Sequence, residues 1–324
     1  MLDAALRERG CEVALVDGDA DEASLAEQVR DARLLLTCYA PITAAVIDAA
    51  PHLAGIVKYG VGIDAIDISA AIRRRVPVVN VPEYAEETVA EGAFTLMLAL
   101  LKRLIPVDRE MHARGWLWPD RQWLGRDLAG ATVGLVGLGR IGRCFARMAG
   151  AGFRARVLGF DPHVDAATMR AAGVDKRDDL LAMLGECDVV SLHCVLNDET
   201  RHLIGHRELA AMRRDAFLVN VSRGRLVDEA ALVDALVAGR IAGAGLDVFG
   251  QEPLALAGHP LSPLFTLPNV ILSPHLTFYT HEAMERLERD TLERCVEILE
   301  GRPVQVRSRD PRLRAQTHGV TFER

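Results

Sequence analysis

The sequence predicts an α/β protein built from two doubly wound parallel-sheet domains. Short β-rich runs alternate with amphipathic segments along the chain, and parallel neighbouring strands need a crossover connection that a helix can supply. The length of 324 residues suggests two domains at about 150 residues each. With 50% hydrophobic and 26% charged residues, the composition is typical of a globular chain.

The alternation runs through both halves of the chain. In the first half we expect strands at 12–16, 34–38, 55–60 and 76–82, with helices at 23–32 and 42–50. In the second half we expect strands at 132–139, 155–161, 188–194, 216–222, 242–249 and 269–275.

Two longer helices are predicted to connect these halves. Apolar residues recur at helical spacing through 86–114, and a second helical pattern covers 281–300 and ends at Gly301 and Pro303. The second helix can carry the chain back to its first half. We therefore expect a discontinuous domain of residues 1–90 plus 282–324, a domain of residues 91–281, and an active cleft between them.

Charge and composition exclude several classes of protein. The formal net charge is −7 and the pI is about 5.8, which argues against nucleic-acid binding as the main function. The apolar run 93–101 is too short to span a bilayer, and the N-terminal segment lacks a secretory pattern, so we expect a cytoplasmic protein. The six cysteines form no CxxC pair and are expected to be reduced.

The strongest motif is a glycine-rich turn after the strand expected at 132–136. Gly137, Gly139 and Gly142 follow the strand directly and lead into an apolar helix. Glycines at this spacing permit a tight turn, close approach of a pyrophosphate and close helix packing, and the helix N-terminus favours the anion. The alternative is a structural glycine-rich turn that binds nothing.

A carboxylate completes this dinucleotide-binding pattern. Asp161 ends the next strand, 19 residues beyond Gly142, where it can bind both hydroxyls of an adenosine ribose. Its charge would repel a 2′-phosphate, and Pro162 and His163 supply no arginine to bind one. The sequence therefore predicts NAD as the cofactor, in preference to NADP.

Three further segments place reactive side chains after predicted strands. Arg223, Glu252 and His275 follow the strands expected at 216–222, 242–249 and 269–275. Ligands of open parallel sheets bind beyond the carboxyl ends of the strands, so these side chains can converge in one crevice.

Together these motifs resemble the D-isomer-specific 2-hydroxyacid dehydrogenases over nearly the whole chain. The resemblance rests on GLGRIG, Asp161, NVSRG with VD, GLDVF with Glu-Pro, and SPH, in that order. It implies a Rossmann NAD-binding domain, a flavodoxin-like substrate domain, a homodimer, and a catalytic triad of Arg223, Glu252 and His275. His275 would give a proton to the carbonyl oxygen of a 2-oxo acid, Glu252 would favour the protonated ring, and Arg223 would bind the substrate carboxylate and carbonyl.

The resemblance also implies binding residues outside the triad. The substrate carboxylate would be bound by backbone amides of the loop that contains Val61 and Gly62. Lys58 could bind a second anionic group of the substrate, or it could be a solvated surface lysine. The expected cofactor contacts are Thr88, Gly137, Gly139, Arg140, Ile141, Gly142, Asp161, Val195, Thr200, Val221 and Asp247.

Other candidate residues have simpler interpretations. His202 and His206 stand four apart like metal ligands, but Gly205 weakens a helix there, so we expect an ordinary helix entry and no metal site. His193 is expected to order a loop rather than to catalyse. Trp116, Trp118 and Trp123 lie in an arm that we expect to form an interface.

Departures from the family pattern leave alternatives open. Gly250 stands where the family often has an acidic residue, and Val195 where it often has proline. The chain opens in a helix without the family's first strand, which suggests a start upstream of Met1.

Rivals to this function are a non-catalytic NAD-sensing protein, a formate dehydrogenase and a regulated 3-phosphoglycerate dehydrogenase. Glyoxylate, hydroxypyruvate, phosphohydroxypyruvate and longer 2-oxo acids remain possible substrates.

Overall fold

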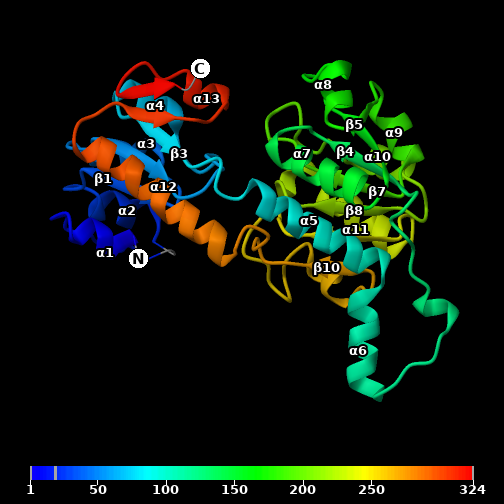
Figure 1. Cartoon of the computed structure of the whole chain (residues 1–324). Helices are drawn as coiled ribbons and strands as arrows, with labels where there is room; N and C mark the ends of the chain where they lie inside the picture. Colours follow the sequence, from blue (N-terminus) through cyan, green and yellow to red (C-terminus); the bar gives the residue numbers. More distant parts are fainter. Residues whose placement is uncertain (1, 18–19, 323–324) are drawn as a thin grey trace. The chain divides into compact units, whose positions relative to one another are not determined.

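A computed structural model describes residues 2–17 and 20–322 of the chain, which fold as two compact units (Figure 1). One unit contains the residues up to Ala85 together with those from Thr280 onward, and the other is Glu86–Tyr279.

The larger unit is built on a seven-stranded parallel sheet in the order β10-β9-β8-β7-β4-β5-β6. Its strands are β4 (Thr132–Val136), β5 (Arg156–Phe160), β6 (Asp175–Lys176), β7 (Val189–Leu192), β8 (Phe217–Asn220), β9 (Gly243–Leu246) and β10 (Val270–Leu272). The order reverses between β4 and β7, which is where ligands bind in doubly wound folds. All six strands expected here are confirmed, and the predicted α/β class is correct.

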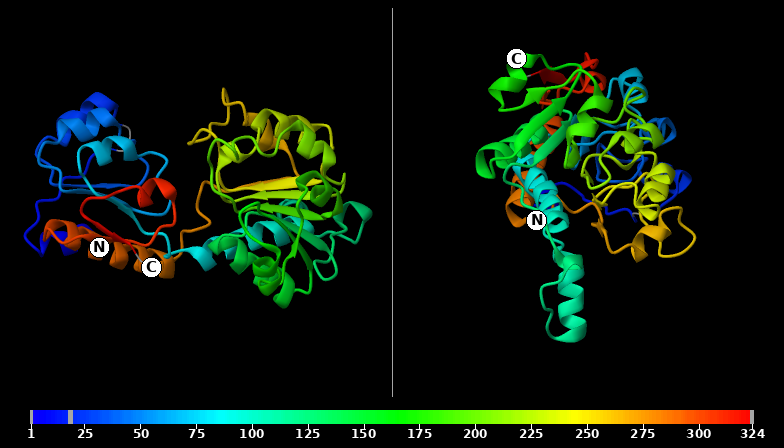
Figure 2. Two further views of the ribbon diagram at one scale, coloured as in Figure 1. Left: turned by 90° about the horizontal axis from the view of Figure 1, so that it is seen from above. Right: turned by 90° about the vertical axis from the view of Figure 1, so that its right-hand side faces the viewer.

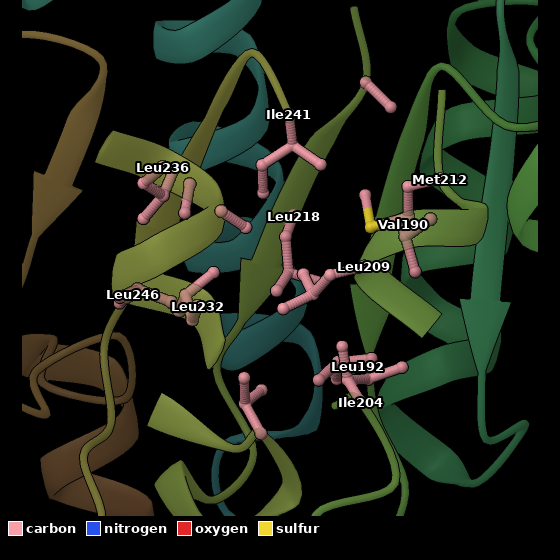
Figure 3. Close-up of a cluster of buried hydrophobic side chains, with 14 of the residues drawn as sticks. Val190, Leu192, Ile204, Leu209, Met212, Leu218, Leu232, Leu236, Ile241 and Leu246 are labelled. Carbon is pink, nitrogen blue, oxygen red and sulfur yellow. The ribbon is translucent and has the colours of Figure 1, made fainter. Parts of the chain in front are cut away.

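Helices cover both faces of this sheet (Figure 2). One face packs on α9 (Leu180–Glu186), α10 (His206–Ala211) and α11 (Glu229–Val237), and the other on α5 (Glu86–Leu101), α7 (Arg140–Arg147) and α8 (Ala166–Ala171). Successive strand residues alternate between the faces: Leu218 joins the core in Figure 3, whereas Phe217 and Val219 join the opposite one. Both faces are buried, as expected for a parallel sheet.

The predicted helix at 86–114 is instead two helices. After α5 the backbone at Arg103 turns left-handed, with φ 52°, and α6 (Leu104–Arg114) begins. No residue of α6 is buried, and α6 extends away from the sheet in Figures 1 and 2. The apolar periodicity did not reveal this break because it depends on one backbone conformation.

The smaller unit contains a three-stranded parallel sheet of β1 (Leu34–Thr37), β2 (Gly55–Lys58) and β3 (Val78–Asn80). Its helices are α1 (Leu2–Arg7), α2 (Glu22–Gln28), α3 (Ala44–Ala49), α4 (Ile68–Arg73), α12 (His281–Leu299) and α13 (Pro311–Arg314). Ile298 of α12 packs so closely on Gly55 that a Cβ there would lie 2.7 Å from it. The helix predicted at 281–300 is thus confirmed as part of the core of this unit.

Two features of this unit differ from expectation or were not foreseen. The strand expected at 12–16 is wrong, because this segment pairs with no strand of the described residues, and Leu15 is 83% exposed. A second parallel pair, β11 (Val304–Val306) with β12 (Val320–Phe322), forms near the C-terminus. Between them the buried Gln316 side chain binds β3, accepting from Val78 N (2.6 Å) and donating to Val78 O (2.8 Å).

Candidate active site

The turn after β4 has the shape that a bound dinucleotide requires. At Gly137, with φ 94°, a Cβ would lie 2.6 Å from Cys194 N, so only glycine lets this turn approach the loop after β7. A Cβ at Gly142 would lie 2.5 Å from Gly137 O, whereas Gly139 has no atom within 4 Å of its Cβ position. The space where a side chain of Gly139 would lie is therefore empty, at the N-cap of α7. The residues of this turn fit the pyrophosphate of NAD.

Asp161 lies next to this turn. One of its carboxylate oxygens accepts from Leu138 N and the other from His163 N, each at 2.9 Å. The carboxylate therefore both orders the glycine turn and places negative charge beside it. Arg140 begins α7 and pairs with Glu86 at 3.2 Å.

The remaining expected cofactor residues lie in this same unit. Thr88 and Val221 are buried, at 6% and 7% exposure, and Ile141 is half-buried. Val195 is 70% exposed, and its carbonyl accepts from the Thr200 hydroxyl at 2.7 Å. This bond links Val195 and Thr200 within the loop between β7 and α10.

His193 lies at the end of β7 and is structural in this conformation. Its Nε2 lies 2.9 Å from Ser191 Oγ, and its ring lies 5.1 Å from that of Phe145. Burial lowers the pKa of His193 to about 3, which favours the neutral imidazole near pH 7.

The structure brings His275 and Glu252 together. His275 Nδ1 lies 2.9 Å from Glu252 Oε2, although 23 residues separate them. Burial alone would raise the pKa of Glu252. The hydrogen bonds from His275 and from Phe249 N, with the positive charges of His275 and Arg223, outweigh burial and hold that pKa below its usual 4.5.

Arg223 lies near this pair, since its charge acts on Glu252. Its backbone position is set by the buried Asn220, whose side chain donates to Arg223 O (2.9 Å) and accepts from Ser222 N (3.1 Å). Next in the chain, a Cβ at Gly224 would lie 2.0 Å from Phe249 C. The turn that carries Arg223 is thus in direct backbone contact with the turn that leads to Glu252.

Asp247 has a positioning role that its sequence context did not reveal. The side chain is fully buried, and it accepts from Leu276 N (2.9 Å), from Thr277 N (3.1 Å) and from the Thr277 hydroxyl (2.6 Å). These bonds hold the segment that follows His275 in place. His275 itself lies in the left-handed region, with φ 59°. Asp247 therefore orients the imidazole.

The residues expected to bind substrate lie in the smaller unit. Gly60 has φ 125°, and Val61 O accepts from the Asn80 side chain at 2.6 Å, which orders the loop through Gly62. Lys58 is 8% exposed, and its ammonium donates to Cys38 O and lies 5.5 Å from the centre of the Tyr39 ring. The interpretation of Lys58 as a solvated surface lysine is therefore wrong.

The two histidines four apart lie at the entry to a helix, as expected. His202 has φ 53° and lies in a turn, whereas His206 is the first residue of α10, whose N-cap Gly205 donates its N–H to Glu208. Within residues 2–17 and 20–322, no cluster of three or more histidine, cysteine or acidic side chains could hold a metal ion. All six cysteines are free thiols.

Comparison with known proteins places the chain in a family. Residues 94–277 match the model of the D-isomer specific 2-hydroxyacid dehydrogenase NAD binding domain. A glyoxylate reductase of Korarchaeum cryptofilum is 41% identical over 85% of this chain and 82% of its own length. A D-3-phosphoglycerate dehydrogenase of Methanocaldococcus jannaschii is 37% identical over 86% of this chain and 52% of its own.

Solved structures agree with this placement. The crystal structure of D-lactate dehydrogenase from Aquifex aeolicus, complexed with NAD and lactic acid, superposes with a TM-score of 0.81 and 28% identity over 92% of this chain and 91% of that one. The fold and the glycine turn define an NAD-binding protein, and its relatives define the class as NAD-dependent oxidoreductases that act on a CH–OH group. The chain belongs to the D-isomer-specific 2-hydroxyacid dehydrogenase family, as its motifs predicted, and NAD is its cofactor.

These findings favour an enzyme over the non-catalytic alternative, because the relatives named above are dehydrogenases and reductases. In the part of the chain that the structure describes, no helix is both long and apolar enough to cross a membrane.

Proposed function

We propose that this enzyme reduces a small 2-oxo acid, with glyoxylate as the first candidate, to the corresponding D-2-hydroxy acid. The observation that carries the proposal is the 2.9 Å contact between His275 Nδ1 and Glu252 Oε2. The glyoxylate reductase of Korarchaeum cryptofilum, at 41% identity, supports this choice of substrate.

The triad residues have distinct roles in this reaction. NADH, when bound, supplies the hydride that reduces the carbonyl carbon. Because Nδ1 of His275 is paired with Glu252, the proton given to the carbonyl oxygen is the one on Nε2, and the imidazolium becomes a neutral imidazole. Glu252 stabilises the imidazolium before transfer, and Arg223 stabilises the negative charge that develops on the oxygen.

We assign binding of the substrate carboxylate to the backbone amides of Val61 and Gly62, and the role of substrate domain to the unit formed by residues up to Ala85 and from Thr280 onward. Thr88, Val195, Thr200 and Val221 are assigned to the cofactor together with the glycine turn.

An NADH-oxidation screen tests the reaction. The screen uses four substrates: glyoxylate, hydroxypyruvate, phosphohydroxypyruvate and pyruvate. Each is tested with wild-type enzyme, with His275→Ala and with His281→Ala, a matched control at an exposed histidine. We expect turnover to fall about 10²–10⁴-fold in His275→Ala, with NADH affinity retained, and to be unchanged in His281→Ala. Equal activity of His275→Ala and wild type would remove His275 from the mechanism.

The relative named D-3-phosphoglycerate dehydrogenase favours a second candidate, a substrate that carries a phosphate as well as a carboxylate, with Lys58 as the cation that pairs with the phosphate. Under this alternative, Lys58→Met raises KM for phosphohydroxypyruvate much more than KM for glyoxylate. An equal rise for both substrates would assign Lys58 to the fold of the loop alone.

A homodimer formed through the arm is the proposed assembly. Residues 104–124 expose Leu104, Trp116, Trp118 and Leu124 at 57–78%, an apolar concentration typical of an interface. Sedimentation equilibrium of Trp118→Ser should give a weaker dimer than wild type or Val237→Ser, which alters another exposed apolar residue, on α11. A wild-type monomer at micromolar concentration would contradict the proposal.

A further inference from the structure

Two charged side chains bind the backbone of Gly250, one at its N–H group and the other at its carbonyl oxygen. Gly250 N donates to Glu229 Oε1 at 2.7 Å, and Gly250 O accepts from Arg225 Nε at 3.1 Å. A Cβ at Gly250 would lie 2.8 Å from Glu229 Oε2 and 3.5 Å from Arg225 Cγ. The glycine therefore fits between the two side chains, and a larger residue would displace the carboxylate.

Both charged residues come from the segment that carries Arg223. Arg225 belongs to the short 3-10 turn Gly224–Leu226, and Glu229 is the first residue of α11, where a carboxylate is favoured by the helix dipole. The turn itself is fixed from its other side, since Arg225 O accepts from His202 N and Leu226 O from Ile204 N. Arg225 and Glu229 therefore bind Gly250 from a segment whose own backbone is held by hydrogen bonds.

Glu252 lies two residues beyond Gly250. Its Oε1 accepts from Phe249 N, the residue just before Gly250, and its Oε2 faces His275. A shift of the Gly250 peptide would move Phe249 N and so rotate the Glu252 carboxylate away from the imidazole.

We propose that Glu229 and Arg225 are positioning residues that hold the Gly250 peptide and thereby align the Glu252 carboxylate with His275. The inference rests on the proposed dehydrogenase function. Neither residue touches substrate in this scheme, and each acts through Glu252. The glycine at 250, where an acidic residue would clash with Glu229, is the feature of this chain that makes the arrangement possible.

The first test measures the pH profile of NADH oxidation with glyoxylate in Glu229→Ala, Glu229→Gln and Asp234→Asn. Asp234→Asn is the matched control, an exposed acid on the same helix. In Glu229→Ala we expect kcat to fall roughly 10-fold, KM for NADH to change less than about twofold, and the alkaline limb of the profile to move to lower pH. Glu229→Gln keeps an oxygen that accepts from Gly250 N and should retain most activity.

The second test measures the alignment of Glu252 with His275 in the absence of catalysis. The ring of His275 is titrated by NMR in protein with labelled histidine. Glu252→Gln gives the reference midpoint for a His275 ring that has lost its carboxylate partner. The titration midpoint in Glu229→Ala should move from the wild-type value towards that of Glu252→Gln. Gly250→Ala, which forces Glu229 away, should reproduce the shift, and the double variant should shift no further than either single variant.

The outcomes separate the two proposals. If wild-type enzyme reduces no 2-oxo acid but the His275 midpoint shifts as expected, the reaction assignment fails and the positioning role stands. If wild-type enzyme is active and the midpoint is unchanged in both Glu229→Ala and Gly250→Ala, the positioning role is overturned. Should Glu229→Ala fail to fold, Gly250→Ala alone decides.

Discussion

Asp247 binds Thr277 twice, through the backbone N–H at 3.1 Å and through the hydroxyl at 2.6 Å, both to the same carboxylate oxygen. Because Thr277 follows His275 by two residues, this buried carboxylate fixes the direction in which the imidazole leaves the backbone. The left-handed φ of His275 persists because these bonds compensate for its cost.

Replacement of Asp247 by asparagine tests this relationship. One carboxylate oxygen becomes an NH₂ group that faces the N–H donors of Leu276 or Thr277. We expect a loss of about 1.5–3 kcal/mol in the free energy of unfolding, measured by urea denaturation, because a buried charged acceptor is lost. kcat should fall as well, whereas Asp234→Asn should change neither quantity.

The paired Glu252 predicts a dependence of stability on pH. Its pKa is lower in the folded protein than the usual 4.5, so its contribution to stability is present above pH 4.5 and is lost as the pH falls through the folded-state pKa. Glu252→Gln should therefore unfold at a lower temperature than wild type near pH 7. The difference between the two Tm values should shrink below about pH 4. A constant difference across this range would contradict the pairing.

Two glycines of the dinucleotide turn should respond differently to alanine. At Gly142 a methyl group would lie 2.5 Å from Gly137 O, so Gly142→Ala should lower both Tm and NADH affinity. At Gly139 nothing lies within 4 Å, so Gly139→Ala should leave Tm near that of wild type and weaken NADH binding alone. Fluorescence titration with NADH measures the affinity, and Gly152→Ala, an equally open position in the same unit, is the control.

Gln316 should matter for stability far more than its place near the C-terminus suggests. Gln316→Leu leaves Val78 N and Val78 O without their side-chain partner, and we expect a cost of about 1–3 kcal/mol for each buried group left unpaired. Urea unfolding measures this cost. The exposed Gln28→Leu on α2 should have little effect, and equal stability of the two variants would contradict the role of Gln316.

The parts of the fold that were predictable have local causes. The glycine turn, the strand before it and Asp161 are recognisable because strand, turn and helix are adjacent in the chain and each glycine has a steric reason. The candidate triad was found because each member follows a strand whose pattern is clear. Asn220 and Gly224 were already within the quoted motif, and their contribution becomes evident only when the neighbouring segments are placed.

The parts that were missed depend on partners distant in the sequence. The segment 12–16 has the β-rich pattern of a strand, but a strand also requires a neighbour, which it does not have within the described residues. Nothing around Gln316 indicates that its amide binds Val78, 238 residues away. The contacts of Glu229 with Gly250 likewise join residues from separate strand ends, so no local pattern could predict them.

The close approach of Gly224 to Phe249 and Gly250 also affects how this enzyme can be redesigned. The guanidinium of Arg223 and the carboxylate of Glu252 stand on loops whose backbones meet at Gly224 with no room for a methyl group, so a library that randomises the loop of Arg223 should keep glycine at 224.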